Sequence, residues 1–185
     1  MSSKINALIE AAIIAALAMA LSLVPDFASW FTPSFGAAPL ILFSLRRGSK
    51  YGIFAGFIWG LLYFILGRVY YLSLSQVLLE YILAFASMGL AGLFAAPLQK
   101  ALKQQQRKKA LFSALIAACF AVFTRYFWHF LAGVIFWGAY APKGMSPLFY
   151  SLLVNGSACI FTLLFVTAAL IILLMTQSSF FLPKR

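Results

Sequence analysis

Residues 147–175 read PLFYSLLVNGSACIFTLLFVTAALIILLM and contain no charged side chain. An α-helix rises about 1.5 Å per residue, so this stretch is long enough to cross a hydrocarbon core about 30 Å thick. A long uncharged segment of this kind indicates a membrane-spanning helix. The fold class that follows is an all-α integral membrane protein.

Similar apolar stretches fill most of the chain. Hydrophobic residues make up 64% of its 185 residues, about 118, and six spans of about 20 residues would need about 120. We therefore predict six transmembrane helices in a single membrane domain, residues 1–185, which leaves no room for an ATPase or another soluble domain. The predicted helices cover residues 5–24, 35–45, 51–66, 72–98, 110–138 and 147–175.

The predicted helix at 35–45 is unusually short. Pro33 and Pro39 bracket its start, and its cleanly apolar part would rise only about 15 Å, half the thickness of a bilayer. Two interpretations stay open. The segment is either a short, kinked packing helix or a helix interrupted by a binding cavity, as in many transporters.

The basic residues indicate how the chain lies in the membrane. A net charge of +11 in a soluble protein would suggest nucleic acid, but these cations cluster between apolar segments, so we expect no nucleic-acid partner. Only Arg68 and Lys143 fall on the predicted outer side. Because cytoplasmic loops collect Lys and Arg, both termini are predicted to be cytoplasmic. The predicted inner side holds Lys4, Arg46, Arg47, Lys50, Lys100, Lys103, Arg107, Lys108, Lys109, Lys184 and Arg185.

Only three residues in the chain are acidic, and one of them lies deep in a predicted helix. Asp26 falls in an outer loop, where solvation accounts for it. Glu10 lies near the start of the first helix, where a helix N-terminus favours negative charge. Glu80 is eight residues into the helix 72–98, about 12 Å from its outer end. An ionisable group at that depth is costly, so Glu80 is the first candidate for function.

Two further polar residues lie at a similar depth. His129, the only histidine, is about 13 Å from the outer end of its helix, and Asn155 is about 12 Å from the end of the last helix. Three helices that agree in depth favour a pocket, although hydrogen bonds that merely hold a bundle together are the alternative.

A stripe along the fifth predicted helix supports a pocket for a flat ring. Arg125, His129, Gly133 and Trp137 are each four residues apart, so they share one helix face. Gly133 would leave a slot between its neighbours. Arg125 lies deeper, and either pairs with Glu80 or closes the floor of the pocket.

Aromatic residues surround the same region. Tyr81 adjoins Glu80, and Tyr70 precedes the fourth helix. Tyr150 approaches from the rim, and Trp30 lies in the first outer loop. A carboxylate among Trp, Tyr and His side chains suits a flat aromatic cation, through charge pairing and cation–π attraction. Trp59 is instead interpreted as part of an interfacial aromatic belt.

No combination of residues supports catalysis. The chain has one histidine, the two cysteines Cys119 and Cys159 inside apolar stretches, no second carboxylate beside Glu80 and no phosphate-binding glycine loop. We therefore expect neither an enzyme nor a metal or cofactor site. Energy for uphill transport would come from partners or from an ion gradient.

Two stripes of small residues would allow close helix contacts. Gly52, Gly56 and Gly60 are interpreted as internal packing. The alanine stripe either packs internally or docks another membrane subunit; it consists of Ala12, Ala16 and Ala20.

Taken together, these segments resemble a known family. The segments on which the resemblance rests are LSLVP at 21–25, SLRRG at 44–48, LSLSQVLLEY at 72–81, RYFWHFLAGVIFW at 125–137 and YSLLVNG at 150–156. They are similar to the thiamine-specific substrate-binding subunits, or S-components, of energy-coupling factor (ECF) transporters.

The resemblance implies a six-helix S-component bundle in a bacterial plasma membrane that captures thiamine from outside with high affinity. It also implies a transmembrane coupling subunit and two ATPases as partners, with Ala12 and Ala16 as the docking contact. Two other classes stay open, a self-sufficient secondary transporter of an organic cation and a non-transporting membrane scaffold. The ligand positions implied by the resemblance are Trp30, Tyr70, Glu80, Tyr81, His129, Gly133, Trp137, Tyr150 and Asn155.

Overall fold

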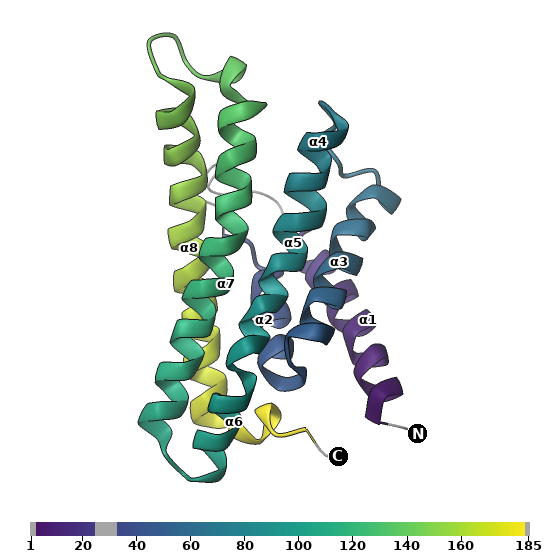
Figure 1. Ribbon diagram of the computed structural model, residues 1–185, viewed down its shortest axis with the longest axis vertical. Coiled ribbons are helices and arrows are strands. Elements are labelled where there is room, and N and C mark those ends of the chain that lie inside the picture. The colour runs from purple at the N-terminus through teal and green to yellow at the C-terminus, as the bar shows by residue number, and fades with distance from the viewer. Residues whose placement is uncertain (1–2, 25–32, 184–185) are drawn as a thin grey trace.

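The computed structural model describes residues 3–24 and 33–183, and none of these residues forms a β-strand. The described chain folds into six helical rods (Figure 1). They are α1 (Ser3–Leu21), α2 (Ala37–Arg47), α3 (Ser49–Ile65), a continuous rod Leu74–Lys103, α7 (Arg107–Ile135) and α8 (Pro147–Thr176). The rod is divided into α4 (Leu74–Val77), η2 (Leu78–Leu83), α5 (Ala84–Ser87), η3 (Met88–Phe94) and α6 (Ala95–Lys103), and the short turns η4 (Gly138–Tyr140) and η5 (Ser178–Phe181) complete the elements.

Four of the helical rods in the described part of the chain are long and apolar enough to cross a membrane. They span Lys4–Leu21, Leu74–Lys103, Arg107–Ile135 and Pro147–Thr176. The apolar helix α3 has 17 residues and α2 has 11. The all-helical, membrane-type fold is therefore confirmed, whereas a count of six spans stays a prediction.

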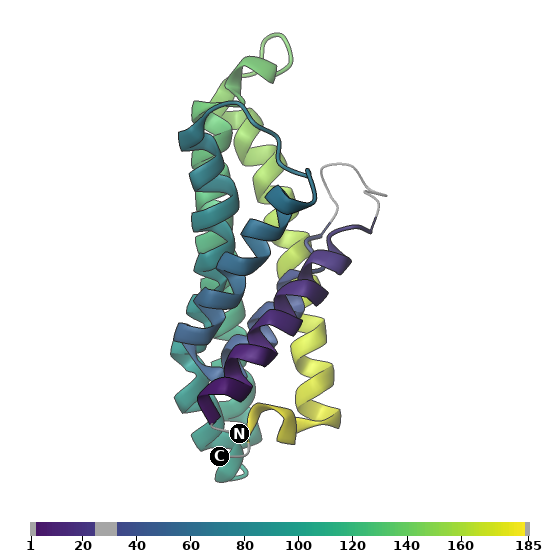
Figure 2. The ribbon, with the colours of Figure 1, turned by 90° about the vertical axis from the view of Figure 1, so that its right-hand side faces the viewer.

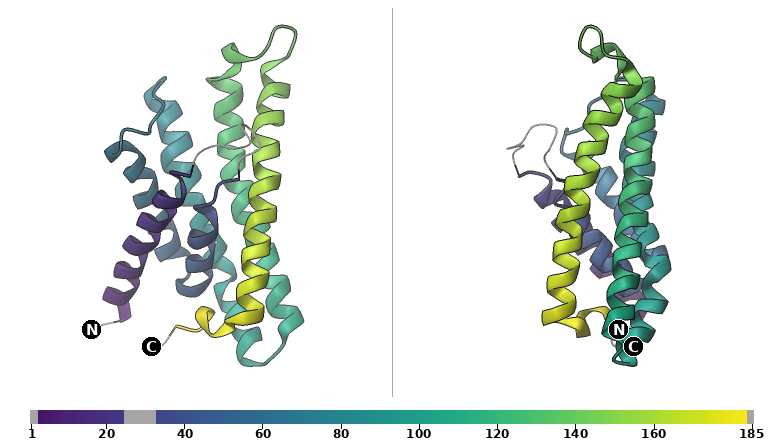
Figure 3. Two further views of the ribbon diagram at one scale, coloured as in Figure 1. Left: turned by 180° about the vertical axis from the view of Figure 1, so that it is seen from behind. Right: turned by 90° about the vertical axis from the view of Figure 1, so that its left-hand side faces the viewer.

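The long helical rods α7, α8 and Leu74–Lys103 run roughly along the long axis of the molecule (Figure 1). Helices α7 and α8 form an antiparallel pair on one side of the molecule, and α1 and α3 lie on the other, with the rod Leu74–Lys103 between them (Figures 1 and 3). Helix α1 is inclined to the long axis (Figure 2). The first and last described residues lie at the same end, opposite the loop that joins α7 to α8 (Figure 1).

The short helix α2 is a packing element at the centre of the bundle. Its residues Ala37–Leu45 are buried with the exception of Leu42, and Leu40, Ile41 and Leu45 have no exposed surface. Pro39 falls in its first turn, where a proline costs no backbone hydrogen bond. Of the two interpretations of 35–45, the structure therefore supports the packing helix.

The glycine stripe of α3 lets this helix approach the neighbouring rod closely. A Cβ atom on Gly56 would lie 2.3 Å from the carbonyl oxygen of Phe85, and one on Gly60 would lie 2.0 Å from that of Tyr81. Side chains at these positions would push the two backbones apart. The prediction that the glycines serve internal packing is confirmed.

The rod that begins at Leu74 continues to Lys103, further than the expected end at residue 98. Ala95, Leu98 and Ala101 are buried on one face of α6, so the helix keeps an apolar side even where its outer side turns polar. The side-chain amide of Gln99 donates to the carbonyl oxygens of Leu45 (3.1 Å) and Arg46 (3.0 Å). The basic stretch 99–109 is therefore mostly helical.

Glu10 joins α1 to α2 through two arginines. Its Oε1 lies 2.5 Å from Nη2 of Arg47, and its Oε2 accepts from Nε of Arg47 (2.7 Å) and Nε of Arg46 (3.2 Å). Arg46 also donates to the carbonyl oxygen of Phe180. The interpretation of Glu10 as a helix-terminus charge is wrong, because it lies beyond the first turn of α1 and its partners are guanidinium groups.

Candidate functional site

Glu80 is held at the centre of a small polar site. It lies in η2, a π-helical segment, and only 9% of its surface is exposed. Its Oε2 accepts a hydrogen bond from the side-chain amide of Gln76, and its Oε1 accepts one from the indole N–H of Trp137 at 2.8 Å. Both donors are neutral. Within the part of the chain that the structure describes, no Lys, Arg or His lies within ion-pairing distance of this carboxylate.

A cavity of about 220 Å³ opens beside Glu80, between η2, α7 and α8. It is somewhat smaller than the roughly 300–1,000 Å³ typical of small-molecule sites. Its lining combines one carboxylate, two aromatic rings, a hydroxyl and an amide, which suits a small polar ring system. The lining residues are Glu80, Gly133, Trp137, Tyr150, Ser151, Val154 and Asn155.

Gly133 brings α8 close to α7 at this cavity. A Cβ atom at Gly133 would lie 2.2 Å from Oγ of Ser151 and 2.9 Å from Nδ2 of Asn155. Asn155 donates to Ser151 Oγ (3.1 Å), and Ser151 donates to the carbonyl oxygen of Phe130 (2.8 Å). Gly133 lines the cavity, but Ser151 occupies much of the space that the missing side chain leaves.

Tyr70 and Tyr81 form the aromatic side of the site without lining the cavity. The Tyr70 ring lies 5.5 Å from the Trp137 ring, and the Tyr81 hydroxyl accepts from the backbone N–H of Tyr70 (3.0 Å). The Tyr81 ring packs against Tyr63 and Phe85, with centroids 5.6 and 6.2 Å away. Tyr81 thus fixes the segment that carries Tyr70.

His129 lies in α7, eight residues before Trp137 and beside Arg125, and does not line the cavity. Its Nε2 accepts a 3.4 Å hydrogen bond from Nε of Arg125. Because an arginine Nε only donates, a neutral His129 carries its proton on Nδ1. In this structure the His129 side chain therefore contacts Arg125 and does not reach the cavity.

Arg125 neither pairs with Glu80 nor lines the cavity. It donates to Oγ of Ser34 (2.9 Å) and contacts Sδ of Met88 (3.3 Å). Its guanidinium lies 4.5 Å from the Phe85 ring and 5.0 Å from the Trp59 ring. The alternative that Arg125 pairs with Glu80 is thus wrong, because this cation is instead stabilised by aromatic faces and by hydroxyl and thioether groups.

Trp59 belongs to the core and not to an interfacial belt. It has no exposed surface, its indole N–H donates to Oγ of Ser22 (3.2 Å), and its ring lies 4.4 Å from that of Phe85. The apolar surroundings and the close glycine contacts of α3 turn this face of the helix inward. The belt interpretation of Trp59 is therefore wrong.

Five of the nine predicted ligand positions meet at one cavity. These are Glu80, Gly133, Trp137, Tyr150 and Asn155. Trp30 lies outside the described residues. The sequence analysis missed Gln76 and Ser151, although Gln76 precedes Glu80 by one helical turn, a spacing that places two side chains on one face.

Larger cavities lie elsewhere but lack this chemistry. One of about 530 Å³ lies at the basic end, where Arg46 and Arg47 already pair with Glu10. Two others, of about 710 and 460 Å³, lie along α7 and between α7 and α8, and their linings are mainly apolar. A fourth, of about 430 Å³, has a polar lining that includes Gln105, Arg107 and Ser178 but no carboxylate.

Comparison with known proteins identifies the family. Residues 8–182 match the family described as thiamine transporter protein (Thia_YuaJ). The chain belongs to the thiamine transporter family. It is 40% identical to the thiamine transporter ThiT of Lacticaseibacillus paracasei over 182 residues, which cover 96% of this chain and 90% of that protein. It is 33% identical to ThiT of Bacillus subtilis over 181 residues, covering 95% and 93% of the two chains.

A solved structure of a family member has the same fold. The structure of ThiT from Listeria monocytogenes superposes with a TM-score of 0.92 at 40% identity, and the match covers 97% of this chain and 99% of the other. The resemblance drawn from the sequence motifs is confirmed.

Proposed function

We propose that this chain is the thiamine-binding membrane subunit of an ECF-type transporter and captures thiamine from outside the cell with high affinity. The observation that carries the proposal is the buried Glu80 carboxylate, held open to a cavity by two neutral N–H donors. Membership of the thiamine transporter family supports the choice of ligand.

The chemistry of thiamine fits this cavity. A thiazolium ring is permanently cationic and cannot lose its charge on burial, so it needs a carboxylate partner. Glu80 offers that charge. The aminopyrimidine ring needs hydrogen-bond partners and a flat neighbour, and the cavity is lined by the polar side chains of Asn155 and Tyr150 and by the Trp137 ring.

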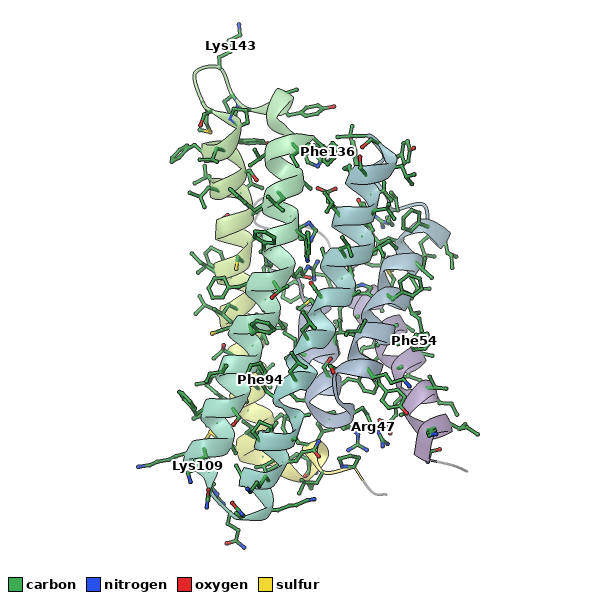
Figure 4. All side chains as sticks on the ribbon, viewed as in Figure 1. Arg47, Phe54, Phe94, Lys109, Phe136 and Lys143 are labelled. Atoms are coloured by element: carbon green, nitrogen blue, oxygen red, sulfur yellow. The ribbon has the colours of Figure 1, made fainter. Side chains whose placement is uncertain are left out.

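We further propose six spans with both termini in the cytoplasm. Arg47 and Lys109 lie at the end of the bundle that also holds the first and last described residues, whereas Lys143 lies at the opposite end (Figure 4). An excess of Lys and Arg marks the cytoplasmic side. The Glu80 cavity then lies toward the outer end, where an external vitamin can reach it.

The alanine stripe of α1 is proposed to dock the coupling subunit. Ala12 and Ala16 are exposed, whereas Ala11 and Ala15 have no exposed surface. Helix α1 therefore uses one small-residue stripe inside the bundle and presents a second one outward. A small-residue face lets a partner helix approach closely.

A thiamine titration of the purified protein tests the proposed function. Binding should quench tryptophan fluorescence, since Trp137 lines the cavity, and should raise the melting temperature by mass action. A protein that shows neither response is a scaffold and not a thiamine-binding subunit. Thiamine accumulation in vesicles that contain this chain alone would instead identify a secondary transporter.

Ala16→Trp tests the docking face. The bulky indole should leave thiamine affinity within about twofold, because Ala16 is remote from the cavity, but should block ATP-driven uptake in vesicles that also contain the coupling subunit and ATPases. Ile13→Trp, on an exposed position beside the stripe, is the matched control and should retain uptake. Uptake that survives Ala16→Trp would contradict the docking assignment.

A further inference from the structure

We infer that Gln76 is the positioning residue of the ligand site: it orients the Glu80 carboxylate and keeps it available to a cationic ligand. The inference rests on the proposed function and adds a residue that does not line the cavity. Gln76 is fully buried and lies in α4, one turn before Glu80.

Gln76 makes three hydrogen bonds, of which two hold its side chain in place. Its backbone N–H donates to Oγ of Ser73 (3.2 Å), and its Oε1 accepts from the backbone N–H of Leu72 (3.1 Å). Its Nε2 donates to Oε2 of Glu80. The pattern Ser-x-x-Gln is similar to a capping box, but here the Gln76 side chain accepts from Leu72, one residue before the N-cap Ser73.

The hydrogen bond from Leu72 determines which end of the Gln76 amide faces Glu80. An amide side chain has one acceptor end and one donor end. Because a backbone N–H only donates, Leu72 must face the oxygen of Gln76, and the NH₂ group is left pointing along the helix toward Glu80. A flipped amide would lose both hydrogen bonds at once, so the donor end is locked toward the carboxylate.

This arrangement holds the carboxylate without neutralising it. Glu80 receives one N–H from Gln76 and one from Trp137, so both oxygens are oriented before a ligand arrives. A lysine or arginine in place of Gln76 would compete with a cationic ligand for the same charge. A neutral donor lowers the cost of burying the anion and leaves its charge for the ligand.

Gln76→Met tests this role, because methionine has a similar length but neither hydrogen-bonding end. A hydrogen bond to a charged group is worth enough to predict a loss of thiamine affinity of about 10-fold or more. The decisive readout is a double-mutant cycle: in a Glu80→Gln background, Gln76→Met should change thiamine affinity by less than about twofold, because its effect passes through the carboxylate.

Ser73→Ala is the matched control. It removes the N-cap hydrogen bond, in which Oγ of Ser73 accepts from Gln76 N–H, but leaves the Gln76–Glu80 contact. It should lower the melting temperature and leave thiamine affinity within about twofold. If Gln76→Met does not purify as a folded protein, Gln76→Asn replaces it, since its shorter side chain cannot reach both Leu72 and Glu80.

The possible outcomes separate the two proposals. If the unaltered protein does not bind thiamine, the proposed function fails. If it binds, and Gln76→Met retains full affinity or weakens binding equally with and without the Glu80 carboxylate, then Gln76 only caps the helix and the positioning role is overturned.

Discussion

Glu10 and Glu80 are two glutamates in opposite halves of one bundle, and their surroundings differ in the charge of the partners. Glu10 is bound by two guanidinium groups, with Arg47 contacting both of its oxygens. Glu80 is bound by an amide and an indole. Both carboxylates are well hydrogen-bonded, but within the described residues only the charge of Glu10 is already paired.

The difference separates a structural carboxylate from a binding one. The ion pairs of Glu10 with two arginines connect α1 to α2 at the basic end of the bundle. The negative charge of Glu10 is therefore already balanced by these arginines. A carboxylate held by neutral donors beside a cavity keeps its full attraction for a cation from outside. Low dielectric surroundings make that attraction stronger than it would be at the surface.

The largest expected effect is that of Glu80→Gln on thiamine binding. The substitution keeps the shape of the side chain and removes its charge, which would leave the buried cation of the ligand unpaired. Loss of one partner of a buried charge pair costs about 3 kcal/mol or more, so affinity should fall at least about 100-fold. Fluorescence titration measures the thiamine affinity, and a loss below threefold would contradict the interpretation of Glu80 as a binding carboxylate.

Trp137→Phe is expected to have an intermediate effect. The variant keeps an aromatic face but loses the indole N–H that donates to Glu80 Oε1. A hydrogen bond to a charged group is worth about 1.5 kcal/mol at the lower end, which corresponds to about a 10-fold loss of affinity. Isothermal titration calorimetry measures this loss, and an affinity equal to that of the unaltered protein would show that Trp137 contributes only its ring.

Glu10→Gln should have the smallest effect on binding and a visible one on stability. It removes the carboxylate that two arginines share, at a position where the Glu10 side chain is 31% exposed. We expect a loss of about 1 kcal/mol of stability and a thiamine affinity within about twofold. A thermal melt in detergent and a parallel titration measure both, and a large loss of affinity would remove the distinction between the two glutamates.

The importance of Glu80 could be predicted from the sequence alone. The depth of an ionisable residue in an apolar helix identified Glu80, because burial of a charge is costly wherever the neighbouring helices lie. The glycine stripe of α3 was equally clear, since only close packing explains small residues at that spacing. Both predictions depend on one helix at a time.

What the sequence did not predict depends on contacts between helices. The partners of Glu10 come from α2, 36 and 37 residues away, and the aromatic surroundings of Arg125 come from α3 and α5. Trp59 turned out to be buried because α3 packs its glycine face inward. Gln76 was within reach of sequence reasoning, because the Ser-x-x-Gln pattern and the spacing to Glu80 are both local.

The role of Glu80 as the partner of the ligand cation can be tested by removing the positive charge of the ligand and the negative charge of the protein in one double cycle. Thiamine and an isosteric analogue with an uncharged thiophene ring are titrated against the unaltered protein and Glu80→Gln. If Glu80 binds the ligand cation, the unaltered protein should prefer thiamine by at least about 10-fold, and Glu80→Gln should bind both ligands within about threefold of each other. An equal preference for thiamine in both proteins would contradict the assignment of Glu80 as the partner of the cation.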